Sequence, residues 1–299
     1  MAPTPRLTAA DFDQELLILF DAYVHGDIDR RGFLDRAAKF AVGGLTAAGL
    51  LAALSPDFAI AQVVPQGDPR ITTERIEFDS PSGYGKVKAY LAKPANASGK
   101  LPAVLVVHEN RGLNPHIEDI ARRLAVDGYL ALAPDALTPL GGYPGDEDKA
   151  RALFAQLDQA KTRQDFIAAA GALKARPEGN GRMGVVGFCY GGGMAHILST
   201  QLPDLAAAVP FYGNHPPAED AAKVKAPLLI HFAGVDERIN AAWPAYEAAL
   251  KTAGVRYTAH QYAGTQHGFN NDTTPRFDAA AAKLAWDRTL AFFAQTLKA

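Results

Sequence analysis

The sequence predicts an α/β fold with a mostly parallel central sheet of about eight strands and helices on both faces. From Arg75 onward, short apolar runs alternate with longer segments whose apolar residues recur at helical spacing. Such an alternation is typical of a parallel sheet that is covered on both sides. An apolar content of 48% in 299 residues is also enough for a core of this size.

The candidate strands are short runs rich in apolar and β-branched residues: 75–78, 87–91, 103–108, 129–133, 183–188, 206–211, 227–232 and 256–262. The first two flank Pro81-Ser82-Gly83 and predict a hairpin. The candidate helices have apolar residues three or four positions apart: 117–126, 162–175, 190–201, 244–253 and 278–297. Because such sheets place their chemistry at the carboxyl ends of the strands, we look for a site in the loops there.

Charge and cysteine content narrow the class of partner. The formal net charge of -2 gives no electrostatic reason to expect nucleic acid or an anionic membrane surface. We therefore expect a small-molecule partner. The single cysteine cannot form an internal disulfide, so it does not identify the redox compartment and leaves a free thiol to be explained.

Residues 1–61 resemble an export signal. Arg30-Arg31, followed by Gly-Phe-Leu, precedes an uncharged run over 40–54 and the small-x-small sequence Ala59-Ile60-Ala61. The paired arginines resemble the twin-arginine signal, so we expect export by that machinery to the periplasm, with 62–299 as the α/β domain. Two features depart from the pattern, because Asp35 follows the arginines and about thirty residues precede them.

The alternative is an N-terminal helical extension on a cytoplasmic protein. Segment 12–23 is amphipathic, and His25-Gly26-Asp27 can turn the chain into a second helix. The apolar run 40–54 is shorter than the ~20 residues that a transmembrane helix needs. We therefore expect no stable membrane anchor.

Cys189 lies where a buried-strand pattern gives way to a helix, in the sequence Gly-Phe-Cys-Tyr-Gly-Gly over 187–192. This arrangement is typical of a nucleophile elbow, a turn so tight that the flanking positions must lack bulk. The first N–H groups of the following helix point toward the nucleophile and can stabilise a thiolate or an oxyanion. The alternative is a buried cysteine that packs as a small apolar side chain.

A thiol with an ordinary pKa of ~8.5 is mostly protonated at neutral pH, so it needs a base, and the base needs a residue that orients it. The elbow predicts the chain order nucleophile, acid, histidine. Asp236 follows the candidate strand 227–232, and His267 follows the candidate strand 256–262. Taken alone, Asp236 could cap a helix and His267 could be a surface residue of a turn. Together with Cys189 they predict a Cys-His-Asp triad at three strand ends.

The loop after candidate strand 103–108 should complete an oxyanion hole. It reads His-Glu-Asn-Arg-Gly, and we expect the backbone N–H groups of Asn110 and Tyr190 to be the donors. Glu109 is out of place there, since a carboxylate beside a thiol disfavours the thiolate. Either Glu109 holds the resting cysteine neutral until substrate displaces it, or it forms an ion pair with Arg111 or Arg122 that fixes the loop.

Four motifs together resemble the dienelactone hydrolases of the α/β-hydrolase superfamily: the elbow GFCYGG, the loop VVHENRGLN, the acid loop GVDERI and the histidine loop HGF. The similarity runs from about Ile71 to the C-terminus. The resemblance implies a triad of Cys189, His267 and Asp236. It also implies that Glu109 contacts the resting thiol and releases it when substrate binds. The reaction implied is hydrolysis of a lactone or ester through an acyl-thioester, without metal or organic cofactor.

The sequence departs from this family at substrate recognition. Members that take the anionic diene lactone have arginines where this chain has Asn271 and Pro139. Neither residue can make the bidentate contact that a guanidinium makes with a carboxylate. We therefore expect a neutral or differently shaped ester or lactone, in a pocket lined by aromatic residues that could instead be ordinary core: Tyr143, Tyr212, Trp243 and Phe269.

Two other functions remain open on the sequence alone. The same triad could transfer an acyl group to an alcohol or amine in place of water. Alternatively, the chain could be a noncatalytic exported protein whose thiol senses oxidation.

Overall fold

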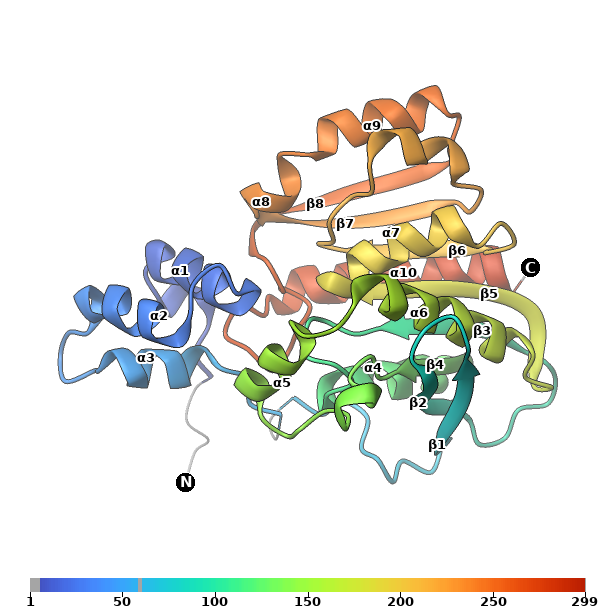
Figure 1. The fold of residues 1–299 in the computed structure, drawn as a ribbon, viewed down its shortest axis with the longest axis horizontal. Coiled ribbons are helices and arrows are strands. Elements are labelled where there is room, and N and C mark those ends of the chain that lie inside the picture. Colours follow the sequence, from blue (N-terminus) through green and yellow to red (C-terminus); the bar gives the residue numbers. More distant parts are fainter. Residues whose placement is uncertain (1–5, 59–60, 299) are drawn as a thin grey trace.

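The structure, a computed structural model, describes residues 6–58 and 61–298. An eight-stranded sheet with the order β1-β2-β4-β3-β5-β6-β7-β8 runs through its centre (Figure 1). The strands are β1 (Ile71–Ser80), β2 (Gly85–Pro94), β3 (Leu101–Val107), β4 (Leu130–Pro134), β5 (Gly179–Phe188), β6 (Ala207–Phe211), β7 (Leu228–Val235) and β8 (Tyr257–Gln266). β2 is antiparallel to β1 and to β4, and the other pairs are parallel, which confirms the predicted mostly parallel sheet.

Helices cover both faces of the sheet (Figure 1). The apolar faces of α4 (Pro115–Val126) and α10 (Ala279–Leu297) pack in one core, and those of α6 (Gln159–Lys174), α7 (Tyr190–Gln201) and α9 (Trp243–Thr252) pack in the other. Strand β3 is buried along its whole length and alternates between the two cores. Burial on both sides explains why its sequence is continuously apolar.

Shorter segments lie in the loops at the carboxyl ends of the strands. They are α5 (Glu147–Phe154), α8 (Glu237–Asn240) and the 3-10 turns Thr138–Leu140 and Ala218–Lys223. The predicted hairpin between β1 and β2 is present, because Ser80 pairs with Gly85 across the turn.

Residues before the sheet form a separate group of helices, which we call the helical unit: α1 (Gln14–His25), α2 (Arg30–Ala37) and α3 (Ala47–Leu54) (Figure 1). Two 3-10 turns, Ala9–Asp11 and Ala38–Phe40, accompany them. The turn after α1 is made at Gly26, whose φ of 88° suits a glycine. The unit has a core of its own, which comprises Leu16, Leu17, Phe20, Tyr23, Phe33, Ala37, Leu50, Leu51 and Leu54.

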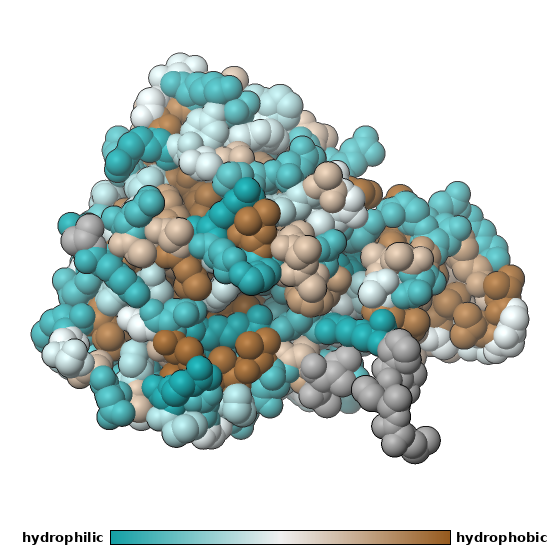
Figure 2. Space-filling model, turned by 180° about the vertical axis from the view of Figure 1, so that it is seen from behind, coloured by the Kyte–Doolittle hydropathy of each residue, from teal (hydrophilic) through white to brown (hydrophobic). Residues whose placement is uncertain are grey.

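The apolar run expected in an export signal is helical only in its second part, as α3. Ala59 and Ile60 of the expected cleavage sequence lie outside the described residues. In the described ranges, no helix is both long enough and apolar enough to cross a bilayer. Viewed from behind, the surface mixes hydrophilic and apolar patches, and the helical unit lies at the right (Figure 2). Three apolar side chains of this part of the chain are exposed: Ile18, Val42 and Leu45.

Candidate active site

Cys189 lies at the turn between β5 and α7 with φ 55° and ψ -113°, a backbone conformation that a residue with a side chain rarely adopts. The glycines around it allow the turn to be this tight. A Cβ atom on Gly187 would lie 1.9 Å from the carbonyl oxygen of Gly191, and one on Gly191 would lie 2.2 Å from that of Val107. Backbone packed this closely holds the sulfur at the rim of the sheet.

Asp236 and His267 follow the ends of the neighbouring strands β7 and β8. His267 Nδ1 lies 2.6 Å from Asp236 Oδ2, and both side chains are buried. An Nδ1–H that donates to the carboxylate leaves Nε2 as an acceptor. Among the described residues, the buried Nε2 atom of His267 has no hydrogen-bond partner. The imidazole is therefore oriented as a base requires.

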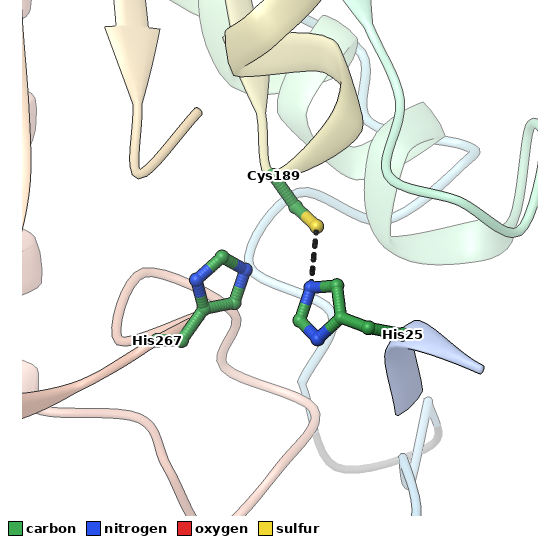
Figure 3. Close-up of side chains that lie close together, drawn as sticks. All are labelled: His25, Cys189 and His267. Atoms are coloured by element: carbon green, nitrogen blue, oxygen red, sulfur yellow. Dashed lines mark hydrogen bonds between the residues drawn. The ribbon is translucent and has the colours of Figure 1, made fainter. Parts of the chain in front are cut away.

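The sulfur lies between two imidazole rings rather than beside one (Figure 3). The Sγ atom of Cys189 and the ring nitrogens of His25 and His267 lie within 4.8 Å of one another. The hydrogen bond of the sulfur goes to His25 Nε2, at 3.3 Å. The two rings meet edge to face with centroids 4.7 Å apart. The structure thus brings the three expected residues together and adds a histidine that the sequence reasoning did not assign to the site.

Asp21 of α1 orients His25. Its Nδ1 lies 2.8 Å from the carbonyl oxygen of Asp21 and 3.3 Å from the Asp21 carboxylate. Burial alone lowers the pKa of His25, but the charge of the Cys189 sulfur and the hydrogen bond with Asp21 outweigh it and raise the pKa to about 9. Burial alone raises the pKa of Asp21, but the facing His267 and His25 rings lower it well below its usual value.

Arg238 of α8 competes for the same nitrogen, since its Nη2 lies 3.0 Å from His25 Nε2. A guanidinium N–H requires a lone pair on that nitrogen, which only a neutral ring offers, whereas a thiolate requires the Nε2–H of a protonated ring. We favour the protonated ring. The reason is that the Asp21 carboxylate lies beside both His25 and Arg238, and a Cys189 thiolate would add a second negative charge next to the two positive ones.

Glu109 lines the same cavity as Cys189, and its contact with the resting thiol stays a prediction. Its Oε2 accepts a hydrogen bond from Asn271 Nδ2 at 2.9 Å. The expected ion pair is not present among the described residues: Arg111 pairs with Glu147 at 3.7 Å, and Arg122 pairs with a carboxylate of its own helix. Glu109 therefore fixes the loop through an amide rather than through an arginine.

The two expected oxyanion donors lie on either side of the elbow. Tyr190 is the first residue of α7, so its backbone N–H has no partner within the helix. Asn110 follows β3 in the loop beside the elbow, and its side chain donates to the carbonyl oxygen of Val24 at 3.0 Å. The helical unit thus contacts the loop that holds the second expected donor.

A small cavity, with about 50 Å³ of space for water-sized molecules, adjoins Cys189. Side chains of the helical unit and of the strand-end loops line it: Phe20, Tyr23, Val24, Ser55, Pro56, Glu109, Asn110, Arg111, Glu147, Asp148, Cys189, His267, Asn271, Thr274 and Arg276. Among the described lining residues, none is one of the four aromatic residues expected in the pocket. Phe20 and Tyr23, on a helix the sequence did not connect with the site, are the aromatic residues there.

The four expected aromatic residues lie outside the lining of the cavity. The Tyr212 ring is 4.9 Å from the His267 ring but is buried beneath it, and Phe269 packs on Tyr212 at 5.5 Å. Tyr143 donates its hydroxyl to Glu147 at 2.8 Å. Trp243 packs at the edge of the core formed with α6, α7 and α9. The expectation that these four residues line the pocket is therefore wrong: they pack in or beside the core instead.

Two arginines, Arg111 and Arg276, face the cavity, and the sequence analysis did not connect Arg276 with the site. Arg276 Nη1 lies 3.0 Å from Asp21 Oδ1, and Arg111 is paired with Glu147. Both guanidinium groups are buried and already face a carboxylate. The cavity therefore holds positive groups whose charge is compensated inside the protein.

The cluster of His25, Cys189 and His267 also consists of atoms that coordinate zinc, namely one thiol sulfur and two imidazole nitrogens. Each imidazole has a carboxylate near its other nitrogen, as metal-binding histidines commonly do. The same arrangement serves a nucleophile and its bases, so the geometry fits both a metal and a metal-free site.

Comparisons with known proteins cover both parts of the chain. The dienelactone hydrolase family model matches residues 87–297, and a second model, YqhI-like, matches residues 3–39. A protein named "Putative hydrolase fragment YghX" from Escherichia coli K12 is 57% identical over 114 residues, 38% of this chain and 97% of that protein. A "Putative carboxymethylenebutenolidase" from Escherichia coli O157:H7 is 34% identical over 230 residues, 72% of this chain and 84% of that protein. The crystal structure of a "Putative Dienelactone Hydrolase" from Klebsiella pneumoniae has a TM-score of 0.67 and 31% identity, and the match covers 75% of this chain and 99% of that one.

Proposed function

Because the chain belongs to the dienelactone hydrolase family, whose members are hydrolases acting on lactones and esters, we propose that it hydrolyses such a substrate with Cys189 as the nucleophile. One observation carries this proposal. A buried imidazole, oriented by Asp236 at 2.6 Å, has an unpartnered Nε2 and a ring nitrogen within 4.8 Å of a sulfur on a strained strand-to-helix turn. These are the parts that nucleophilic acyl transfer requires.

The reaction follows from this arrangement in two steps. The thiol loses its proton to an imidazole, and the sulfur attacks the substrate carbonyl while N–H groups of Tyr190 and Asn110 stabilise the oxyanion. The carbon–oxygen bond of the ester then breaks and leaves an acyl-thioester. Water, activated by His267, releases the acid and restores the thiol.

A neutral substrate agrees best with the charges in the cavity. An anionic acyl group would need an unpaired guanidinium, but Arg276 already faces Asp21 and Arg111 faces Glu147. We therefore expect neutral aryl esters to be hydrolysed more efficiently than the anionic diene lactone.

The test is an intact-mass measurement after the protein is mixed with a panel of lactones and aryl esters. An adduct with the mass of the acyl group should appear on Cys189 and decay with turnover, and Cys189→Ala should abolish both. The variant His267→Asn should accumulate the adduct or lose rate. Near-normal esterase activity in Cys189→Ala would refute the assignment. Transfer of the acyl group to an added alcohol or amine, seen among the products, would identify an acyltransferase instead.

The proposed chemistry needs neither metal nor organic cofactor. Prolonged dialysis against EDTA should therefore leave turnover unchanged. Activity that is lost on dialysis and restored by zinc would show that the three sulfur and nitrogen ligands hold a metal.

For residues 1–61 we propose a retained helical extension, since His25 contacts the reacting sulfur. Export by the twin-arginine route, with removal of this segment, stays a prediction. Sequencing the N-terminus of the protein from its native cell, after separation of periplasm and cytoplasm, would decide between them.

A further inference from the structure

We propose that His25 is a further catalytic residue, which takes the thiol proton of Cys189 and makes the helical unit part of the active site. Its part in turnover rests on the proposed hydrolase function. The pairing of His25 with the sulfur does not, because it can be measured without any ester.

The contact geometry carries the first step. Of the two imidazoles beside the sulfur, His25 is the one within hydrogen-bond distance, at 3.3 Å, whereas His267 Nε2 has no partner among the described residues. The Asp21 contacts to His25 Nδ1 orient that ring as Asp236 orients His267. The sulfur therefore has two oriented imidazoles, and its resting partner comes from α1.

The second step is that His25 is held in place. The end of α1 is tied to the loop after β3, where Asn110 Nδ2 donates to Val24 O at 3.0 Å. The Tyr23 hydroxyl of α1 contacts Asp148 of α5, and Arg30 Nη1, at the start of α2, lies 2.9 Å from Asp148 Oδ2. Because these contacts reach several separate elements, the His25 ring is held in one position, which a free N-terminal segment would not achieve.

A third step concerns the loop beyond β8. Arg276 Nη1 donates to Asp21 Oδ1 at 3.0 Å, and its guanidinium lies over the Phe20 ring at 5.1 Å. Asp21, which orients His25, is therefore itself held by Arg276 from the loop beyond β8. The helical unit and the strand-end loops thus contribute charged groups to one network around the sulfur.

The chemistry divides the work between the two histidines. The S–H bond breaks so that the electron pair stays on sulfur and the proton moves to His25 Nε2, which forms an imidazolium beside a thiolate. After the thiolate attacks, the leaving oxygen takes this proton from His25. His267 stays neutral until it accepts a proton from the water that cleaves the thioester. It then gives this proton to the departing sulfur as the carbon–sulfur bond breaks, which releases the acid and restores the thiol. The first proton transfer is thereby assigned to His25 and the second to His267, and no co-reactant besides substrate and water is needed.

The groups that face His25 define how the pair should respond to pH. They are Asp21 on α1, Cys189 at the elbow, His267 after β8 and Arg238 on α8. Of these, Asp21 and a thiolate favour the protonated ring, whereas His267 and Arg238 oppose it. Removal of His25 should therefore reduce the thiolate fraction at neutral pH and have no such effect at high pH, where an ordinary thiol ionises unaided.

The experiment is alkylation of the full chain by iodoacetamide between pH 6 and pH 10, followed by intact mass. Because the chain has a single cysteine, one adduct reports on Cys189 alone. We expect His25→Gln to alkylate about tenfold more slowly than wild type at pH 7 and at a similar rate at pH 10. His260→Gln, the same change at a histidine of β8 that stacks on His231 rather than on the site, should behave as wild type at every pH. Hydrogen exchange over 14–54 verifies that the variant keeps the helical unit folded.

Two results would overturn the proposal. One is a His25→Gln rate equal to that of wild type at pH 7. The other is a rate that rises by the same factor at every pH, which would mean that His25 merely shields the sulfur. Turnover is measured in parallel, where His25→Gln should slow the release of the alcohol in a single turnover by at least tenfold. If His25→Gln alkylates more slowly but Cys189→Ala keeps esterase activity, the pairing of His25 with the sulfur is confirmed and the proposed function is refuted. If His25→Gln alkylates like wild type but Cys189→Ala is inactive, the proposed function is supported and the role of His25 is refuted.

Discussion

The helical unit is small enough that one core substitution should detach it from the site. Phe33 of α2 is fully buried, and its ring centroid lies 5.4 Å from that of Tyr23 and 6.1 Å from that of Phe20. Replacing such a ring by Ala costs about 3–5 kcal/mol, because apolar contacts are lost and a cavity remains. A unit of this size rarely gains more than about 3–5 kcal/mol from its core. We therefore expect Phe33→Ala to open the helical unit while the sheet stays folded.

The assay is hydrogen exchange resolved by peptide. A loss of about 3 kcal/mol corresponds to roughly a hundredfold larger open population, so amides in 14–54 should exchange much faster while those of β5 do not. Phe293→Ala is the matched control, since it makes the same change at a fully buried ring on α10. That variant should lower the thermal midpoint without opening 14–54 selectively.

Activity measured on the same samples connects this opening with the site. Turnover and alkylation of Cys189 at neutral pH should both fall in Phe33→Ala, because His25 leaves with α1. Wild-type turnover in a protein whose 14–54 peptides exchange fast would refute the reasoning, since the helical unit would then be dispensable. Slow exchange over 14–54 would instead show that the unit draws its stability from the sheet.

Three further predictions test other parts of the site. Asp236→Asn should lower kcat by about 10²–10⁴-fold with little change in KM, because the catalytic imidazole loses its orientation and the charge that stabilises its protonated form; an unchanged kcat would contradict this. Gly191→Ala should abolish folding or activity, since its Cβ would lie 2.2 Å from a carbonyl oxygen of β3, whereas Gly193→Ala, whose nearest atom would be 3.4 Å away, should be tolerated; equal behaviour of the two variants would argue against the close-packed elbow. Burial lowers the pKa of His215 from 6.5 to about 4, so below about pH 6.5 the unfolded chain binds a proton that the folded chain refuses, and stability falls with pH. In urea unfolding, His215→Phe should remove about 2 kcal/mol of the stability loss between pH 7 and pH 4.5.

The sheet could be predicted because burial leaves a direct trace in its sequence. Strand β3 is a continuous apolar run since both of its faces are covered, and the breaks at Gly and Pro mark the hairpin before it. Helix α5 was not predicted. Its eight residues bury only Ala150 and Phe154, too few for a helical period to stand out.

The triad candidates could be found from the order of three residues at strand ends, but His25 could not. Asp21 and His25 stand four residues apart, which places them on one face of a helix. That spacing is common on surface helices, and no local pattern links α1 to a sulfur 164 residues away. Docking of the helical unit is a tertiary event, set by contacts such as that of Asn110 with Val24.

The two interpretations of residues 1–61, a removed export signal and a retained helical unit, also predict substrates of different charge. In the full chain, Arg276 faces Asp21, its guanidinium covers the Phe20 ring, and its Nε has no partner among the described residues. Removal of the first 61 residues would take away both contacts and leave a guanidinium beside the cavity of Cys189. A guanidinium without a carboxylate partner can bind one, so a cleaved protein would favour an anionic acyl group. A retained helical unit favours a neutral one and supplies His25 as well. We therefore expect two properties to occur together: a preference for neutral over anionic esters, and fast alkylation of Cys189 at neutral pH. Both depend on whether residues 1–61 are present.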